Sequence, residues 1–443
     1  MKNCDLIIYG ASQLLTCASN GKAKKGAEMS QLHIIENGAI AVFGEKIAAV
    51  GKTEDILREF QAKKTIDANG KVVSPGFVEC HTHLVFAGNR LNEFELKIKG
   101  ADYLEILKNG GGILSTVHHT REANFKDLVE DARKRLDKML AFGITTCEIK
   151  TGYGLDTETE FKMLEAILEL DRFHAIEIIP TFMPAHTIPF EDYRKKNQFL
   201  MDEIISEDYT SLICDEMLPK LRDWRENVYI DVDRVNFDYT RNKPFFVDVF
   251  CEKNAFTLEQ SRRILETAKS LGFKLKAHVD QFTNLGGTTM AIELGAVSID
   301  HLDAISEIEI GLLANSDTIG VTTPTCNFNF GETKFTDARK LIDAGCAMAV
   351  STDYNPGSAP CPSITNAMAI ACRYQKLPPA EVFNAATINA AFAVGLGEKI
   401  GSLEAGKQAD ILIFDTNDYR ETIYEFGGNF VEKIIKNGRI IEN

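Results

Sequence analysis

The chain has 443 residues, of which 44% are hydrophobic and 26% charged, and its formal net charge at pH 7 is −15. This length and balance are those of a globular protein with a large core and more than one domain. The negative charge, without any run of lysine and arginine, argues against a nucleic acid or an anionic membrane surface as partner, and no stretch is apolar enough for a membrane-spanning helix.

The ten cysteines are scattered along the chain, and no C-x-x-C pair is present. A zinc ribbon or a thioredoxin-type site is therefore not expected, and isolated cysteines in so long a chain argue against a disulfide framework. Near the N-terminus, Asp5 follows the only basic side chain and Gly10 and Ser12 interrupt the apolar run, unlike a signal peptide. We therefore expect a reduced, cytoplasmic protein.

The two ends of the chain share one sequence pattern, in which turn signals separate short β-rich runs. Asn-Gly pairs at 37–38 and 69–70 lie between such runs, as is typical of β-hairpins, and a third pair lies at 437–438. We interpret residues 1–72 and 397–443 as two parts of one small β-sandwich domain formed by both termini.

Between residues 73 and 396 the pattern changes to strands followed by helices. Strands such as "ITTCEIK" and "FFVDVFC" are near-continuous apolar runs, and segments such as "LEQSRRILETAKSLG" have helical periodicity. Repeated β/α units predict a parallel sheet, and about eight of them predict an α/β protein with a (β/α)8 TIM-type barrel. Residues 202–243 interrupt the repeat and hold the only tryptophan, so we interpret them as an insertion that forms a lid or an interface.

Titratable side chains fall where the barrel strands are expected to end, which is where barrels of this type carry their functional groups. The first strand ends in "HTH", and because residues two apart in an extended chain point the same way, His81 and His83 face one point in space. The later strand ends hold Lys150, Tyr153, His186, His278, His301 and Asp353.

Three histidines and one carboxylate suit zinc, with an open position for water, and the same ligands suit iron. For any one histidine alone, a buried ring bonded to a carbonyl is the simpler interpretation, and Asp353 alone would be a cap or turn residue. Five histidines and one aspartate at strand ends together predict a metal site. Metal-assisted hydrolysis is the reaction class, with Asp353 accepting a proton from water and His301 stabilising a developing oxyanion or relaying a proton.

These residues resemble the amidohydrolase superfamily, whose members pair a (β/α)8 barrel with a small β-sandwich built from both termini. Within that superfamily the chain is similar to the imidazolonepropionase family over nearly its whole length. H-x-H and "GKQAD" mark only the superfamily, whereas "HLVFAGNR" and "DYNPGS" are more selective. The stretches that carry the resemblance are "HTHLVFAGNR", "YLEILKNGGGILSTVHHTR", "EIKTGYGL", "VDVFCE", "SIDHL", "STDYNPGS" and "TINAAFAVGLGEKIGSLEAGKQADILIFD".

The resemblance implies a mononuclear zinc or iron site and a reaction, the opening of the 4-imidazolone-5-propanoate ring by water to give N-formimidoyl-L-glutamate in histidine degradation. An arginine suits the propionate carboxylate, and a glycine-containing loop would let backbone amides approach an anion. The implied metal ligands are His81, His83, His278 and Asp353. The implied catalytic residues are Asp353, His301 and Gln281. The implied substrate-binding residues are Arg90, Tyr103, Tyr153, His186, Gln281, Asn355, Gly357 and Ser358.

The chain departs from the family at Gln281 of "HVDQ", where the family has a glutamate. Glutamine keeps the shape and the hydrogen bonding but cannot act as an acid or base. Thr323 and Thr325 in "GVTTPTCNFNF" also replace a more apolar family segment. Three interpretations follow. The chain catalyses the family reaction with proton transfer by residues other than Gln281, or it is a diverged cyclic-amide hydrolase, or it is a catalytically impaired ligand-binding relative. The expected partner is a small cyclic amide with a carboxylate, and a homodimer is the default assembly.

Overall fold

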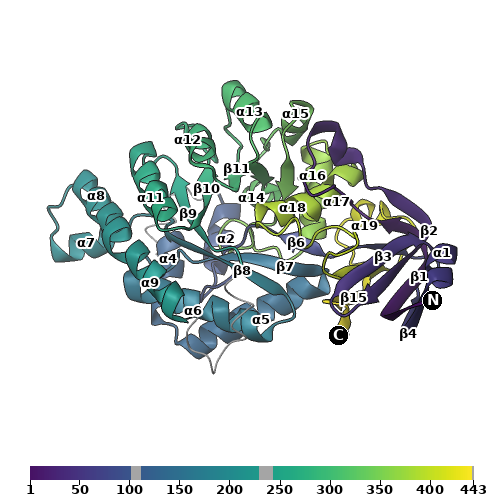
Figure 1. Ribbon diagram of the computed structural model, residues 1–443. Coiled ribbons are helices and arrows are strands. Elements are labelled where there is room, and N and C mark those ends of the chain that lie inside the picture. Colours follow the sequence, from purple (N-terminus) through teal and green to yellow (C-terminus); the bar gives the residue numbers. More distant parts are fainter. Residues whose placement is uncertain (101–110, 229–242, 442–443) are drawn as a thin grey trace.

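The computed structural model describes residues 1–100, 111–228 and 243–441. One of its two eight-stranded sheets is parallel, and its strands follow one another in chain order (Figure 1). Almost all their residues are buried, because helices cover the outer face and inward side chains fill the centre. These strands are β6 (Phe77–Glu79), β7 (Ile144–Lys150), β8 (Glu177–Ala185), β9 (Phe246–Cys251), β10 (Lys274–Val279), β11 (Ser298–His301), β12 (Ile319–Thr322) and β13 (Met348–Val350).

Helices between and after these strands surround the barrel (Figure 1). Several begin at polar caps, since Asn124 and Asp156 each accept a backbone hydrogen bond and Thr257 and Ser306 form capping boxes. They are α2 (Leu91–Ile98), α4 (Ile113–Glu122), α5 (Phe125–Ala141), α6 (Thr157–Phe173), α11 (Leu258–Ser270), α12 (Gly287–Leu294), α13 (Glu307–Ala314), α14 (Pro324–Phe330), α15 (Ala338–Asp343), α16 (Ile364–Tyr374), α17 (Pro379–Ala386) and α18 (Ile388–Ala393).

The first and last barrel strands meet at their carboxyl ends. Thr82, after β6, forms a parallel bridge with Tyr354, after β13, and the His83 N–H donates to the Tyr354 carbonyl at 3.0 Å. The Ser351 hydroxyl donates to the His81 carbonyl, also at 3.0 Å. This seam places the "HTH" segment beside the "STDY" segment, although they lie far apart in the sequence.

The second sheet takes strands from both ends of the chain. Its first strand bulges between Ile8 and Ala11, so that one half pairs with β4 and the other with β5, and the sheet branches there. The predicted boundary at residue 72 falls at the start of β5. The strands are β1 (Lys2–Leu15), β2 (Ile34–Phe43), β3 (Lys46–Lys52), β4 (Phe60–Asp67), β5 (Val72–Pro75), β14 (Ile411–Phe414), β15 (Val431–Lys436) and β16 (Arg439–Ile441), with short helices η1 (Gly26–Ser30), α1 (Thr53–Glu59) and α19 (Glu421–Tyr424).

The predicted fold class, an α/β protein with a TIM-type barrel and a β domain from both termini, is confirmed. Of the three predicted hairpins only the one at 437–438 is correct, where two residues with positive φ join β15 and β16. The pair at 37–38 lies inside β2, opposite the bulge of β1. The pair at 69–70 joins β4 and β5, which both run parallel to β1 and do not pair with each other.

The predicted insertion lies in the connection between β8 and β9 and is helical as far as the structure describes it. Tyr209 anchors it, since its hydroxyl donates to the Pro184 carbonyl at 3.0 Å and its ring is fully buried. None of the helices in the described ranges is long and apolar enough to span a bilayer. The connection contains α7 (Phe190–Lys196), α8 (Asp202–Leu212), the π-helical turn η2 (Ile213–Met217) and α9 (Leu218–Val228).

Apolar contacts join the barrel to the terminal sheet. Phe77 of β6 packs against Phe414 of β14, with ring centroids 6.0 Å apart, and Phe383 contacts both rings. At Gly143, just before β7, φ is +83° and an added Cβ would lie 2.7 Å from a methyl group of Leu412 in β14. This interface therefore leaves no room for a side chain at residue 143.

We expect Gly143→Ala to lower the free energy of unfolding by about 2–5 kcal/mol, because the methyl group overlaps Leu412 and the backbone is left-handed. Gly44→Ala is the matched control, since its φ is +58° and nothing lies within 4 Å of an added Cβ. Only the backbone cost of about 1–2 kcal/mol applies there. Denaturant unfolding measures both, and equal losses would contradict the overlap.

Candidate active site and metal centre

A cavity of about 130 Å³ lies at the carboxyl ends of the barrel strands. The structure thus brings together nearly all the site residues expected from the sequence. His81 lies beside the cavity in contact with the lining histidines, and Tyr103 lies outside the described residues. The predicted residues that line the cavity are His83, Arg90, Tyr153, His186, His278, Gln281, His301, Asp353, Asn355, Gly357 and Ser358.

The four predicted metal ligands lie in one cluster. His81, His83 and Asp353 bring their donor atoms within 4.8 Å of one another, and His278 does so with His81 and His301. His81 Nε2 lies 3.4 Å from Asp353 Oδ1, and His83 Nε2 lies 3.8 Å from the same oxygen. The Nε2 atoms of His83 and His278 are 3.2 Å apart. Ligand atoms on one tetrahedral ion, each at 2.0–2.1 Å, lie about 3.3–3.4 Å apart, so these spacings fit a single metal ion.

These donor atoms are also short of partners. His81 Nε2 and Asp353 Oδ1 are buried and make no hydrogen bond within the described part of the chain. Burial lowers the pKa of His81 and of His83 well below the ordinary value, so both rings are neutral and can offer a lone pair. Buried polar atoms without partners are costly, and a bound cation would satisfy them. The residues present therefore fit a divalent metal.

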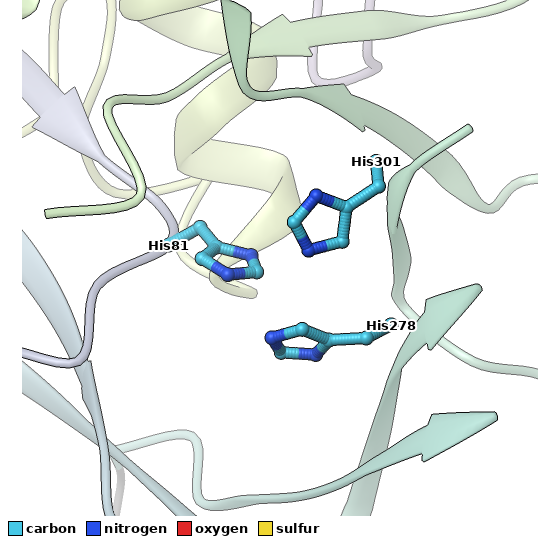
Figure 2. A group of neighbouring side chains, drawn as sticks. All are labelled: His81, His278 and His301. Atoms are coloured by element: carbon cyan, nitrogen blue, oxygen red, sulfur yellow. The ribbon is translucent and has the colours of Figure 1, made fainter. Parts of the chain in front are cut away.

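Two buried carboxylates orient the histidine ligands. Asp300 Oδ2 lies 2.7 Å from His81 Nδ1, and Asp248 Oδ1 lies 3.1 Å from His278 Nδ1. Because an ionised carboxylate only accepts hydrogen bonds, each Nδ1 carries the proton and each Nε2 keeps its lone pair free. Figure 2 shows the rings of His81 and His278, with that of His301, gathered about a common centre.

Lys150 lies among these carboxylates and offsets their charge. Its Nζ is 2.6 Å from Glu148, 2.8 Å from Asp248 and 3.7 Å from Asp300, and all four side chains are fully buried. Burial alone would lower the pKa of Lys150, but the three carboxylates raise it above its ordinary value. Lys150 therefore supports the ligands from the barrel interior as a permanent cation.

Sequence reasoning missed Glu148, Asp248 and Asp300. Each is an acidic residue inside an otherwise apolar strand, in "ITTCEIK", "FFVDVFC" and "AVSIDHL". A charge within a buried strand must find a partner. That pattern, repeated on three strands of one barrel, is the signal that would have found them.

One turn of chain at the start of α14 contacts both residues expected to handle protons. Thr323 Oγ1 lies 3.0 Å from His301 Nδ1, and the Cys326 thiol donates to Asp353 Oδ2 at 2.8 Å. His301 and Asp353 have φ values of +87° and +51°, uncommon conformations that cluster at functional sites. Burial raises the pKa of Asp353 to about 6. With Oδ2 held by the thiol, Oδ1 faces the histidines.

Arg90 enters the cavity with its guanidinium fixed. Its Nε and Nη2 donate to Glu93 at 2.7 and 2.5 Å, which leaves Nη1 uncommitted. An added Cβ at Gly357 would lie 2.0 Å from Nη1. The amides of Gly357 and Ser358 both donate to Asn355 Oδ1 at 2.8 Å. These amides are therefore engaged within the loop, and Gly357 contributes the room that Arg90 needs.

Three further side chains shape the cavity. His186 Nδ1 lies 3.1 Å from the Gly152 carbonyl, so Nδ1 carries the proton and Nε2 is an acceptor; burial lowers the pKa of this ring to about 3. The ring stacks on His83 with centroids 4.5 Å apart, and the buried Tyr153 contacts both rings. The Gln281 amide makes no hydrogen bond to the described residues, so all its donors and acceptors are free for a ligand.

The fold and the site define a class. H-x-H after the first barrel strand, a histidine on β10 and an aspartate after β13 are the donor set of a metal-dependent amidohydrolase, and the Amidohydrolase family matches residues 250–441. The fold is similar to that of an adenosine deaminase from Xanthomonas campestris with bound zinc. The TM-score is 0.68 at 19% identity, over 99% of this chain and 93% of that chain.

More similar proteins narrow the class. An imidazolonepropionase of Chloroflexus aggregans is 47% identical over 441 residues, which cover 100% of this chain and 99% of that protein. An imidazolonepropionase of Herpetosiphon aurantiacus is 46% identical over 441 residues, covering 100% and 98%. The chain belongs to the imidazolonepropionase family, as its sequence motifs predict.

We expect Asp300→Asn to weaken metal binding by about 10- to 100-fold, because an amide no longer fixes the proton on His81 Nδ1. Competition with a chromophoric chelator measures the affinity. Glu309→Gln is the matched control, since Glu309 is a buried carboxylate that bonds Ser306, Asn284 and Thr289 and no histidine. A comparable loss in the control would mean that orientation of His81 does not set the affinity.

Proposed function

We propose that this chain hydrolyses 4-imidazolone-5-propanoate to N-formimidoyl-L-glutamate. The observation that carries the proposal is one small cavity that joins a converging His/Asp cluster to a fixed arginine. In the reaction, water adds to the amide carbon of the ring and the ring C–N bond breaks. The released nitrogen takes up the proton that the water loses, so that one water is consumed for each ring opened.

The metal is zinc or iron, which the His and Asp donors suit equally. When bound, it supplies Lewis acidity and a water of near-neutral pKa. The chain supplies the orientation: Asp300 and Asp248 hold the Nδ1 protons of two ligand rings, and Lys150 offsets part of the charge of these carboxylates. The residues that hold the ion are His81, His83, His278 and Asp353.

Proton transfer falls to His301 and Asp353, because Gln281 cannot exchange a proton. Asp353 accepts the proton on its carboxylate, whose Oδ1 would ligate the metal and whose Oδ2 accepts the Cys326 thiol. The Thr323 hydroxyl lies 3.0 Å from His301 Nδ1, and donation by the hydroxyl would leave the ring proton on Nε2. His301 then donates from Nε2 to the oxyanion that develops on the amide carbonyl.

The remaining lining residues hold the substrate. Arg90 binds the propanoate carboxylate through the N–H groups that Glu93 leaves free. His186 Nε2 accepts a hydrogen bond from a ring N–H, and the Gln281 amide bonds the polar edge of the ring. Tyr153 excludes water from the stacked histidines, while Asn355 and Ser358 keep the neighbouring loop closed on itself.

The state of the cysteines supports a reduced, cytoplasmic setting. All ten cysteines are free and eight of them are buried. Thiols so placed survive where disulfide formation is disfavoured. The homodimer expected from the sequence stays a prediction.

Turnover of 4-imidazolone-5-propanoate by the metal-loaded protein tests the proposal, measured beside Gln281→Glu. We expect the unaltered chain to be active, with little change in the variant, because the proton work lies on His301 and Asp353. A gain of about 10²–10⁴-fold on restoring glutamate would place essential proton transfer at residue 281 instead. If neither protein acts, the substrate is another cyclic amide and the proposal fails.

We also expect turnover to depend on the metal. Dialysis against a strong chelator should abolish activity, and zinc or iron(II) added back separately should restore it, because water alone is a poor nucleophile at neutral pH. Metal analysis of the purified protein, beside the recovered kcat for each ion, identifies the ion used. Full activity of the metal-free protein would contradict the proposed role of the cluster.

A further inference from the structure

Lys97 lines the same cavity as Arg90 but was given no role by the sequence. Four residues apart on α2, Glu93 and Lys97 lie on one face of the helix. Lys97 Nζ is 2.7 Å from Glu93 Oε1 and 5.3 Å from the ring centroid of Phe330. The Lys97 side chain is only 29% exposed, so its ammonium group is held at the cavity and does not extend into solvent.

Glu93 lies between two cations. It accepts two hydrogen bonds from Arg90, an ion pair from Lys97 and a hydrogen bond from the Gly112 N–H at 2.8 Å. Burial would raise the pKa of Glu93, but these donors lower it to about 2, so the carboxylate is ionised. Two positive charges therefore meet one negative charge, which leaves one positive charge in excess at this part of the cavity.

Both cations keep donors for a ligand. A guanidinium has five N–H groups and an ammonium has three, and Glu93 takes two of the former and one of the latter. Within the described ranges, Glu93 is the only acidic partner of either side chain. Gly357 leaves room for the guanidinium, since an added Cβ there would lie 2.0 Å from Arg90 Nη1.

We propose that Lys97 is a second ligand of the substrate carboxylate, acting together with Arg90. The inference rests on the proposed function, which supplies a substrate with one carboxylate. Bound there, that carboxylate neutralises the excess charge and completes an alternating set of two cations and two carboxylates. Glu93 is the positioning residue that holds both cations at the spacing of one carboxylate. The cavity thereby selects substrates with a single negative charge over neutral analogues.

The test crosses Lys97→Met with two substrates, 4-imidazolone-5-propanoate and its neutral propanamide analogue. We expect Lys97→Met to lower kcat/KM for the carboxylate by about 10- to 100-fold, through KM with kcat retained, because one charge-assisted hydrogen bond is lost. The amide analogue should lose less than about twofold. Lys97→Arg, which keeps the charge, should recover most of the affinity.

Lys99→Met is the matched control, because Lys99 ends the same helix, pairs with the exposed Glu95 and does not line the cavity. Equal losses on both substrates, or no loss on either, would overturn the inference. Calorimetric binding of imidazole-4-propanoate separates this result from the fate of the proposed function. A chain that turns over neither substrate fails as an imidazolone hydrolase, whereas unchanged binding in Lys97→Met overturns the role of Lys97.

Discussion

The buried ion network around Lys150 is the interaction on which the rest of the site depends. Lys150 and three carboxylates lie fully buried in the barrel interior, and a second buried ammonium group, that of Lys276, lies 3.9 Å from Glu148. Removing such groups from water is costly, and the cost is offset only when every charge is paired and hydrogen-bonded. Here the pairing has a second effect. Two of the carboxylates that pair with Lys150 also accept the Nδ1 protons of two histidines. These buried carboxylates therefore fix the direction in which the histidine lone pairs point.

The fold was largely predictable because its signals are local. A short stretch of sequence already indicates an apolar strand or an amphipathic helix, and the repeated alternation of the two predicts a barrel. In the same way, H-x-H predicts two side chains on one face of a strand. The Asn-Gly pairs show the limit. A left-handed turn is encoded locally, but whether the flanking strands pair with each other or with β1 depends on residues elsewhere in the sheet. Hence one hairpin of three was correct.

The site was predictable where the residue type alone carries the chemistry. Histidines at strand ends and an arginine after the first strand could be assigned without coordinates. The partners of the supporting groups could not be assigned. An acidic residue inside a buried strand, such as Asp248, signals that a partner exists but not which one, and Cys326 reaches Asp353 only through the tertiary fold. The same holds for Lys97, which lies on an ordinary helix with alternating charges. Lys97 differs from its neighbours on the helix only because it lines the cavity, and the sequence does not show which residues line a cavity.

The residue type at Gln281 bears on which groups exchange protons. In the proposed mechanism the neutral amide of Gln281 leaves proton exchange to His301 and Asp353. Thr323 and Cys326, at the start of α14, contact these two residues.

The seam between the first and last barrel strands has a consequence for how the protein folds. Ser351 and the carbonyl of His81 are separated by 270 residues along the chain, yet they bond directly. Such a contact closes a long loop, which costs entropy that local contacts do not. Because the "HTH" and "STDY" segments meet at this junction, the reactive centre is complete only when the two ends of the barrel have docked.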